Sequence, residues 1–321
     1  MVIHPSHTVP SQPPPVWKIA TAFAIVYLGY GLNFLAIKAA VETLPAFLFA
    51  ASHILGAGLL LMAWTALRGE KILLPPAAMA RAATAALFLF VGGVGLVTQG
   101  EKLGVPSGVA AIIKASVPLW VAVIEALRPR GEKPGALAIV GLLIGAGGVA
   151  ALVLPRLATN SESTLSTGIW LLLLSALLFA IGSIFIRHNP PSTHTTKGVF
   201  WMMLFGGTYL ALLGTAFGEF SQITAADFAP PALAAFAFLL FVHSLAAFTA
   251  MNWLLKHLPA PLVTTKFFVS PAIAVVAGWF VLGEPIGTAT LASLALILVG
   301  VAIVFRSPKT SPKEEDLTAD Q

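Results

Sequence analysis

Two lysines stand inside long apolar stretches of the sequence, where a charged side chain is unexpected. Lys114 lies within residues 106–127 and Lys266 lies within residues 261–282. Each stretch is long enough to cross a bilayer as a helix, and a lysine at mid-membrane costs roughly 2.5–3.5 kcal/mol on insertion scales. We therefore expect both ammonium groups to face a polar interior, where they would bind the carboxylate or phosphate of a solute.

A proline follows each lysine at a similar distance: Pro118 comes four residues after Lys114, and Pro271 comes five residues after Lys266. Proline removes one backbone hydrogen bond and tends to kink a helix, so each charge would lie beside a bend. Ser270 is four residues after Lys266 and would share its helix face. The alternative is that a lysine extends to the membrane interface, which is easier for Lys266 because it lies nearer the start of its stretch.

Other polar and aromatic residues are candidates for the same interior. Asn33 lies in mid-span, and Tyr30 lies three residues earlier on the same face. We expect both to contact substrate; a hydrogen bond between helices is the alternative for Asn33. Trp120 and Trp201 would stack on an apolar or aromatic substrate, or alternatively anchor their helices at the interface.

Three residues are candidates for coupling transport to protons. His53 and His243 lie inside expected spans, where an imidazole could carry a proton near neutral pH. The alternative is a neutral histidine bonded to a neighbour. Glu101 lies near a span end, where an interfacial position is the alternative, and no aspartate lies inside any expected span. Proton coupling and facilitated export therefore both remain open.

The composition is that of a membrane protein. Hydrophobic residues make up 58% of the chain and charged residues only 10%, whereas soluble domains have about 25% charged residues. The net charge of +5 comes from basic residues between apolar runs, so it does not indicate nucleic-acid binding. The chain has no cysteine and no HExxH or GxSxG motif. We expect no cofactor, no metal, no catalytic residue and no enzymatic activity.

Ten apolar runs follow one another along the chain. They can cross lipid only as helices, because backbone polar groups in a bilayer must be satisfied within the segment. We thus expect an all-α membrane protein with ten transmembrane helices. The expected spans are 17–38, 44–67, 77–98, 106–127, 135–154, 167–187, 198–217, 231–255, 261–282 and 287–305.

The distribution of lysine and arginine predicts the topology. With the N-terminus in the cytoplasm, thirteen basic residues fall on the cytoplasmic side and three on the opposite side. Both termini are therefore expected to be cytoplasmic. Residues 1–16 and 306–321 are expected to be disordered tails, because the first is rich in Pro, Ser and His and the second in Lys, Glu and Asp.

The two halves of the chain repeat each other. Residues 31–34 (GLNF) correspond to 182–185 (GSIF), and 131–135 (GEKPG) correspond to 283–287 (GEPIG). We expect two five-helix units, at 17–154 and 167–305, joined by a linker at 155–166. An odd number of helices turns the second unit upside down relative to the first, which is the inverted repeat of secondary transporters with a site at the midplane.

A small-residue motif lies in the fifth expected span. Gly141 and Gly145 form a GxxxG pattern, which allows close helix packing. Packing within one molecule and dimerisation both remain open.

Several segments resemble a known superfamily. YGLNFLAIK in the first span, VPSGVAAIIKASVPLW in the fourth and VSPAIAVVAGWFVLGEPI in the ninth are similar to the drug/metabolite transporter superfamily, in particular its EamA-type ten-helix exporters. The resemblance implies a basket of ten helices around a central cavity, with alternating access. This chain has His53 where members often carry arginine. It has Lys114 and Lys266 where they often carry apolar, aromatic or small residues.

Together these features predict a secondary transporter that exports small organic solutes, amino acids or related metabolites above all. The alternative is an organic-anion, phosphorylated-metabolite or drug transporter of the same fold. The expected partners are a small-molecule substrate and the lipid bilayer, with no nucleic acid. The expected location is the inner (plasma) membrane of a bacterium, as a multi-pass protein, and the oligomeric state stays open.

Overall fold

Helices are the only regular elements in the part of the chain that the structure describes. The structure is a computed structural model and describes residues 14–128, 134–159, 163–192, 195–258, 260–263 and 265–306. Most of both expected tails lies outside these residues, as do four basic residues used for the topology: Arg130, Lys133, Lys309 and Lys313.

The first half of the chain contains these elements: α1 (Val16–Gly31), α2 (Asn33–Val41), α3 (Ala46–Leu67), α4 (Pro76–Ala86), the π-helix η1 (Leu87–Gly95), α5 (Leu96–Lys102), α6 (Ser107–Ala115), α7 (Val117–Leu127) and α8 (Ala136–Thr159). The second half contains α9 (Ser163–His188), α10 (Thr195–Ala216), the short 3₁₀ helices η2 (Glu219–Gln222) and η3 (Ala225–Asp227), α11 (Pro230–Ala237), the π-helix η4 (Phe238–Ala247), α12 (Phe248–His257), α13 (Ala260–Val263), α14 (Lys266–Leu282) and α15 (Thr288–Arg306).

Nine helical segments of the described chain are long and apolar enough to span a membrane, and α14 is a shorter apolar helix. Nine of the ten expected spans are found close to their predicted bounds. The first and fourth spans are interrupted, between α1 and α2 and between α6 and α7, yet keep their full length. The ninth differs, because its separation into α13 and α14 leaves only Lys266–Leu282 as a continuous apolar helix. At the break, the Thr265 hydroxyl donates to the backbone oxygen of Leu262 at 2.6 Å and pairs with the Tyr27 hydroxyl at 2.7 Å. Side-chain bonds of this kind compete with helical backbone bonds.

The segment 155–166, expected as a linker, is largely helical. Helix α8 continues to Thr159 and α9 begins at Ser163. The Arg156 guanidinium donates to the Leu152 backbone oxygen at 2.7 Å and to the Thr290 hydroxyl at 3.0 Å. Arginine near a helix C-terminus stabilises the last turn by binding its carbonyls, which explains why α8 extends beyond 154.

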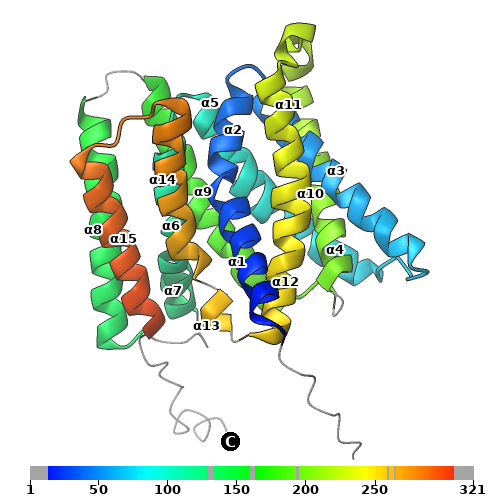
Figure 1. Cartoon of the computed structure of the whole chain (residues 1–321), viewed down its shortest axis with the longest axis horizontal. Helices are drawn as coiled ribbons and strands as arrows, with labels where there is room; N and C mark the ends of the chain where they lie inside the picture. Colours follow the sequence, from blue (N-terminus) through cyan, green and yellow to red (C-terminus); the bar gives the residue numbers. More distant parts are fainter. Residues whose placement is uncertain are drawn as a thin grey trace, which may run out of the picture.

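The long helices stand side by side in a bundle (Figure 1). Helix α8 packs on α15 at one side, and α3 packs on α10 at the other. Glycine permits the first contact: a Cβ on Gly300 would lie 2.6 Å from the Gly141 oxygen and 2.6 Å from the Gly145 nitrogen. The GxxxG motif thus packs within one molecule.

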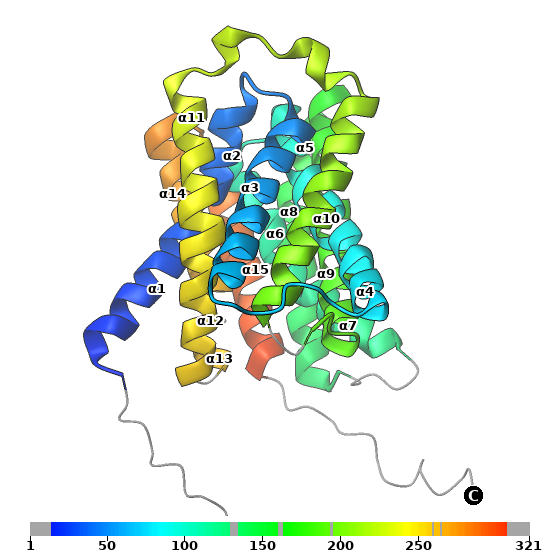
Figure 2. The ribbon, with the colours of Figure 1, turned by 90° about the vertical axis from the view of Figure 1, so that its right-hand side faces the viewer.

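Two other glycines allow the C-terminal end of α1 to pack closely against its neighbours. A Cβ on Gly29 would lie 2.6 Å from the Ala247 side chain, and one on Gly31 would lie 2.7 Å from Ile273. Helix α1 therefore contacts η4 and α14 closely at its C-terminal end. Its N-terminal half leans away from α12 (Figure 2).

Candidate functional site

A cavity of about 220 Å³ lies in the middle of the bundle, between elements of both halves. Its walls come from α1, α2, η1, α5, α6, α7, α9, η4 and α14. Since one water occupies about 30 Å³, the space corresponds to about seven waters, which suits a small solute. The polar lining side chains are Tyr30, Asn33, Lys114, His243, Lys266 and Ser270.

Lys114 is held by protein acceptors on three sides. It lies in the last turn of α6, which ends at Ala115 before α7 begins at Val117. The helix is therefore interrupted beside this lysine, with Pro118 in the first turn of α7, whereas Pro271 lies inside the continuous helix α14. The Lys114 ammonium donates to the Gly93 oxygen at 3.3 Å, and to the Ser175 oxygen and hydroxyl at 3.3 and 3.1 Å.

The acceptors around Lys114 come from the π-helix η1 and from α9, which lie close together. A Cβ on Gly92 would lie 2.7 Å from Leu178, and one on Gly93 would lie 2.6 Å from Phe179. Two consecutive glycines thus let η1 approach α9, where the Ser175 hydroxyl donates to the Gly93 oxygen at 3.0 Å. The Phe179 ring lies below the Lys114 ammonium, 4.5 Å from its centroid. All three donors of this lysine therefore have partners.

Lys266 has weaker partners. It is the first residue of α14, and its ammonium donates to the Met251 sulfur at 3.0 Å. It also lies 3.7 Å from the centroid of the Tyr30 ring and 5.2 Å from that of Phe267. A thioether is a weak acceptor, and an aromatic face attracts a cation without using a lone pair. This ammonium can therefore still take a strong acceptor.

Tyr30 and His243 support this corner of the cavity. Their rings meet edge to face, with centroids 5.0 Å apart. The His243 Nδ1 lies 3.1 Å from the Gly29 backbone oxygen, so Nδ1 donates and Nε2 is left for another partner. Tyr30 is thereby fixed between the imidazole and the Lys266 ammonium.

Two cavity side chains have buried oxygen atoms without a hydrogen-bond partner in the described chain. They are Asn33 Oδ1 and Ser270 Oγ. Asn33 is the first residue of α2, and Ser270 lies one turn into α14, so the starts of two interrupted helices line the cavity. Helix N-termini carry unpaired N–H groups and partial positive charge, which favour an anion. The arrangement can thus bind a small solute that has both a negative group and hydrogen-bonding groups.

The two tryptophans expected near substrate do not line this cavity. Trp201 donates from Nε1 to the Ile72 oxygen at 2.8 Å and packs against Phe200 and Phe205 on α10. Trp120 lies on α7, beyond the break, and packs against the apolar core. Indole stacking on a solute in this cavity is therefore not available to either residue.

Two of the three expected coupling residues also lie outside the cavity lining. His53 is buried on α3 beside the Phe49 ring, at 5.5 Å between centroids, and neither ring nitrogen has a partner in the described chain. Glu101 is fully buried on α5, and its carboxylate oxygens likewise lack a described partner. The Lys38 ammonium donates to the Glu101 backbone oxygen at 3.0 Å and not to the Glu101 carboxylate. Of the three, only His243 lines the cavity.

A carboxylate in the loop before α15 joins the two halves, and the sequence showed it only as part of a repeated motif. Glu284 accepts from the Ser107 N–H at 2.6 Å, the Gly108 N–H at 3.1 Å and the Ser107 hydroxyl at 3.0 Å. These groups form the start of α6, the helix that carries Lys114. Glu284 therefore caps that helix from the other half of the chain.

Comparison with known proteins shows that the chain is similar to several membrane transporters. Among curated sequences it is 31% identical over 290 residues to the uncharacterized inner membrane transporter YedA of Escherichia coli (strain K12), covering 88% of this chain and 89% of the relative. It is 27% identical to the uncharacterized transporter YvbV of Bacillus subtilis (strain 168), covering 92% and 94%. It is also 29% identical to protein PagO of Salmonella typhimurium, covering 90% and 93%.

A solved crystal structure shares the fold, with a TM-score of 0.60 at 18% identity over 90% of this chain and 96% of the other. The family model described as "EamA-like transporter family" matches twice, at residues 17–154 and 166–306. Two matches that together span most of the chain, and relatives similar over nearly their whole length, show that this protein belongs to the EamA-like transporter family of the drug/metabolite transporter superfamily.

Proposed function

We propose that this transporter exports small organic solutes, amino acids or related metabolites above all, across the inner membrane of a bacterium. One observation carries the proposal: the first turns of two interrupted helices and two lysines, one from each half, line a single small cavity. Interrupted helices whose N-terminal ends face a midplane site are the means by which several transporter folds bind an anionic group.

Within this proposal the polar residues have distinct roles. The Lys266 ammonium pairs with the substrate carboxylate beside the start of α14, and Tyr30 fixes the direction of its side chain. Asn33 Oδ1 accepts a hydrogen bond from the substrate ammonium, and the Ser270 hydroxyl makes a further hydrogen bond to the substrate. Lys114, whose donors already have protein acceptors, keeps the opposite wall polar.

Alternating access follows from the duplication. The two matched units each contain five helical spans when α13 and α14 are taken together, so consecutive crossing of the membrane would invert the second unit relative to the first. We propose that both termini are cytoplasmic and that the units rock about the cavity, which would open first to one side and then to the other.

Coupling to protons is proposed through His243, because it is the one of the three coupling candidates that lines the cavity. His53 and Glu101 could act only through a neighbouring helix, since neither borders the cavity. Facilitated export without a coupling ion is the alternative, and an imposed proton gradient distinguishes the two.

A second substrate class has specific support. Two ammonium groups line the cavity, and none of its lining residues in the described chain is Asp or Glu. This charge balance also fits an organic anion or a phosphorylated metabolite, because lysine binds phosphate as a point charge. A drug-like cation fits it least well.

Proteoliposomes test the proposal. Saturable flux of amino acids, organic acids and phosphorylated metabolites would be compared for wild type, Lys266→Met and a control, Lys71→Met, whose lysine is exposed between α3 and α4. We expect flux of at least one carboxylate solute, lost in Lys266→Met and kept in the control. Absence of saturable flux across the whole panel would contradict the proposed function.

A further inference from the structure

A long groove lies on the outer surface of the bundle, between α1 and the η4–α12 segment. It has a volume of about 1020 Å³ and is open along its length. The groove exists because the N-terminal half of α1 leans away from α12 (Figure 2). The groove and the central cavity share no lining residue in the described chain, and Ala22 in the groove wall packs with Val26 and Leu254.

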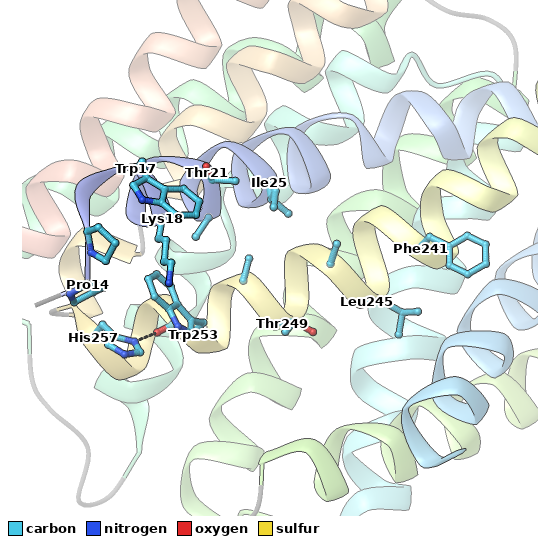
Figure 3. A pocket seen from close by; sticks show the side chains of 14 residues that line it. Pro14, Trp17, Lys18, Thr21, Ile25, Phe241, Leu245, Thr249, Trp253 and His257 are labelled. Carbon is cyan, nitrogen blue, oxygen red and sulfur yellow. Dashed lines mark hydrogen bonds between the residues drawn. The ribbon is translucent and has the colours of Figure 1, made fainter. Parts of the chain in front are cut away.

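The two ends of the groove differ in chemistry, as Figure 3 shows. Trp17 and Lys18 from α1 meet Trp253 and His257 from α12 at one end. Towards the other end the lining is apolar, with Ile25, Leu245 and Phe241. Tryptophan beside lysine is the composition of a membrane interface, and an apolar continuation is the composition of the hydrocarbon region.

The length of the groove matches one lipid leaflet with its headgroup. From Phe241 to His257 the chain advances 16 residues, which is at most about 24 Å at the 1.5 Å per residue of an α-helix, because the π-helical residues of η4 rise less. Half of a hydrocarbon core of about 30 Å is about 15 Å. The apolar part therefore accommodates an acyl chain, and the remaining length reaches headgroup depth.

The polar end has a lysine and a histidine that make no ion pair with an acidic residue of the described chain. Lys18 makes no ion pair within the described chain, and its ammonium lies 5.5 Å from the centroid of the Trp17 ring. In Figure 3 its side chain extends across the groove towards Trp253. The His257 Nδ1 donates to the Trp253 oxygen at 2.8 Å, which leaves Nε2 for another group. Both side chains are thus placed to bind a phosphate.

We propose that this groove binds one anionic phospholipid, with its phosphate at Lys18 and His257 and one acyl chain along Ile25, Leu245 and Phe241. Charge selects the anionic class, because a lysine near an anionic membrane surface contributes about 1 kcal/mol, which corresponds to about fivefold in affinity. The two tryptophans border the glycerol region. The site is independent of the central cavity and of the solute that it carries.

Native mass spectrometry of the purified full chain in mild detergent tests this site with two probes, phosphatidylglycerol and phosphatidylcholine. We expect wild type to retain one lipid and to prefer phosphatidylglycerol. Lys18→Gln should lower that preference about fivefold, whereas Lys71→Gln, an exposed lysine outside the groove, should leave it unchanged. Thr249→Trp, a change at an exposed residue of the groove, should fill the groove and abolish binding of phosphatidylglycerol and of phosphatidylcholine.

Three results would overturn the proposal. The first is an unchanged lipid preference in Lys18→Gln, and the second is full lipid retention in Thr249→Trp. The third is a wild-type protein that binds no lipid but forms a dimer, which Thr249→Trp abolishes. The last result would assign the groove to a second copy of the chain. Thermal unfolding of each variant in the same detergent checks that the fold is intact.

Discussion

The two cavity lysines occupy opposite ends of their helices, and this difference separates their roles. Lys114 lies in the last turn of α6, where unpaired carbonyls favour a cation, and three acceptors surround its ammonium. Lys266 is the first residue of α14, where the helix dipole disfavours a cation, and its partners are a sulfur and aromatic faces. An anion that bound there would satisfy both the lysine and the helix end.

The comparison shows how a duplicated sequence can place one residue type in two different environments. The lysines occupy similar places in the repeat, yet the helix breaks before Lys266 and after Lys114. The position of the break decides whether the ammonium meets carbonyl oxygens or N–H groups. We infer that Lys114 is structural and that Lys266 is the anion anchor.

The largest effect is expected from Lys266→Met, which keeps the length and removes the charge. Loss of one partner from a buried charge pair costs about 2–5 kcal/mol, so flux of a carboxylate substrate should fall about 100-fold. The measurement is the initial rate in proteoliposomes at equal protein density. Wild-type flux in this variant would remove Lys266 from the site.

Lys114→Met should have the next largest effect, mainly on stability. Its ammonium bonds to Gly93 and Ser175 would be lost, and the free energy of unfolding should fall by about 2 kcal/mol. Carboxylate flux should fall less than about tenfold. Thermal unfolding in detergent and flux would be measured on the same preparation. A stable Lys114→Met protein without flux would reverse the assignment of the two lysines.

Ser270→Ala sharpens the comparison at the Lys266 corner. The hydroxyl has no partner in the described protein, so its removal should leave stability unchanged. A neutral hydrogen bond to substrate contributes about 1 kcal/mol, and KM should therefore rise about fivefold. Ser175→Ala is the matched change at the Lys114 corner, where the serine binds the lysine; there we expect lower stability with KM unchanged. The opposite pattern would place substrate beside Lys114.

The smallest effect is expected from Glu284→Gln. The carboxylate caps α6, and the loss of such a cap lowers the free energy of unfolding by about 1 kcal/mol. Since Glu284 acts on the far end of the Lys114 helix, the relative flux of different solutes should not change. A changed solute preference in this variant would show that the cap also positions the cavity.

The sequence predicted the spans and the polar residues of the cavity because these follow from local rules. Apolar length determined the spans, and the cost of a charge in lipid identified Lys114 and Lys266 as interior residues. Asn33, Tyr30, Ser270 and His243 followed from helical spacing or from polarity inside a span, and all line the cavity.

Other features depend on tertiary contacts that sequence patterns do not contain. The break before Lys266 involves a hydrogen bond between Thr265 and Tyr27, which are far apart in the chain. The position of the Trp201 side chain depends on a hydrogen bond to the backbone oxygen of Ile72, which is also far away in the sequence. The cap made by Glu284 was visible only as a repeated motif, because its partners Ser107 and Gly108 belong to the other half.

The central claim is that Lys266, and not Lys114, recognises the negative group of the solute. The most direct test is the ratio of flux for a carboxylate solute to flux for its uncharged amide, measured in proteoliposomes with wild type, Lys266→Met and Lys114→Met. We predict that the preference for the carboxylate disappears in Lys266→Met and persists in Lys114→Met. A preference that survives in Lys266→Met but disappears in Lys114→Met would contradict the account.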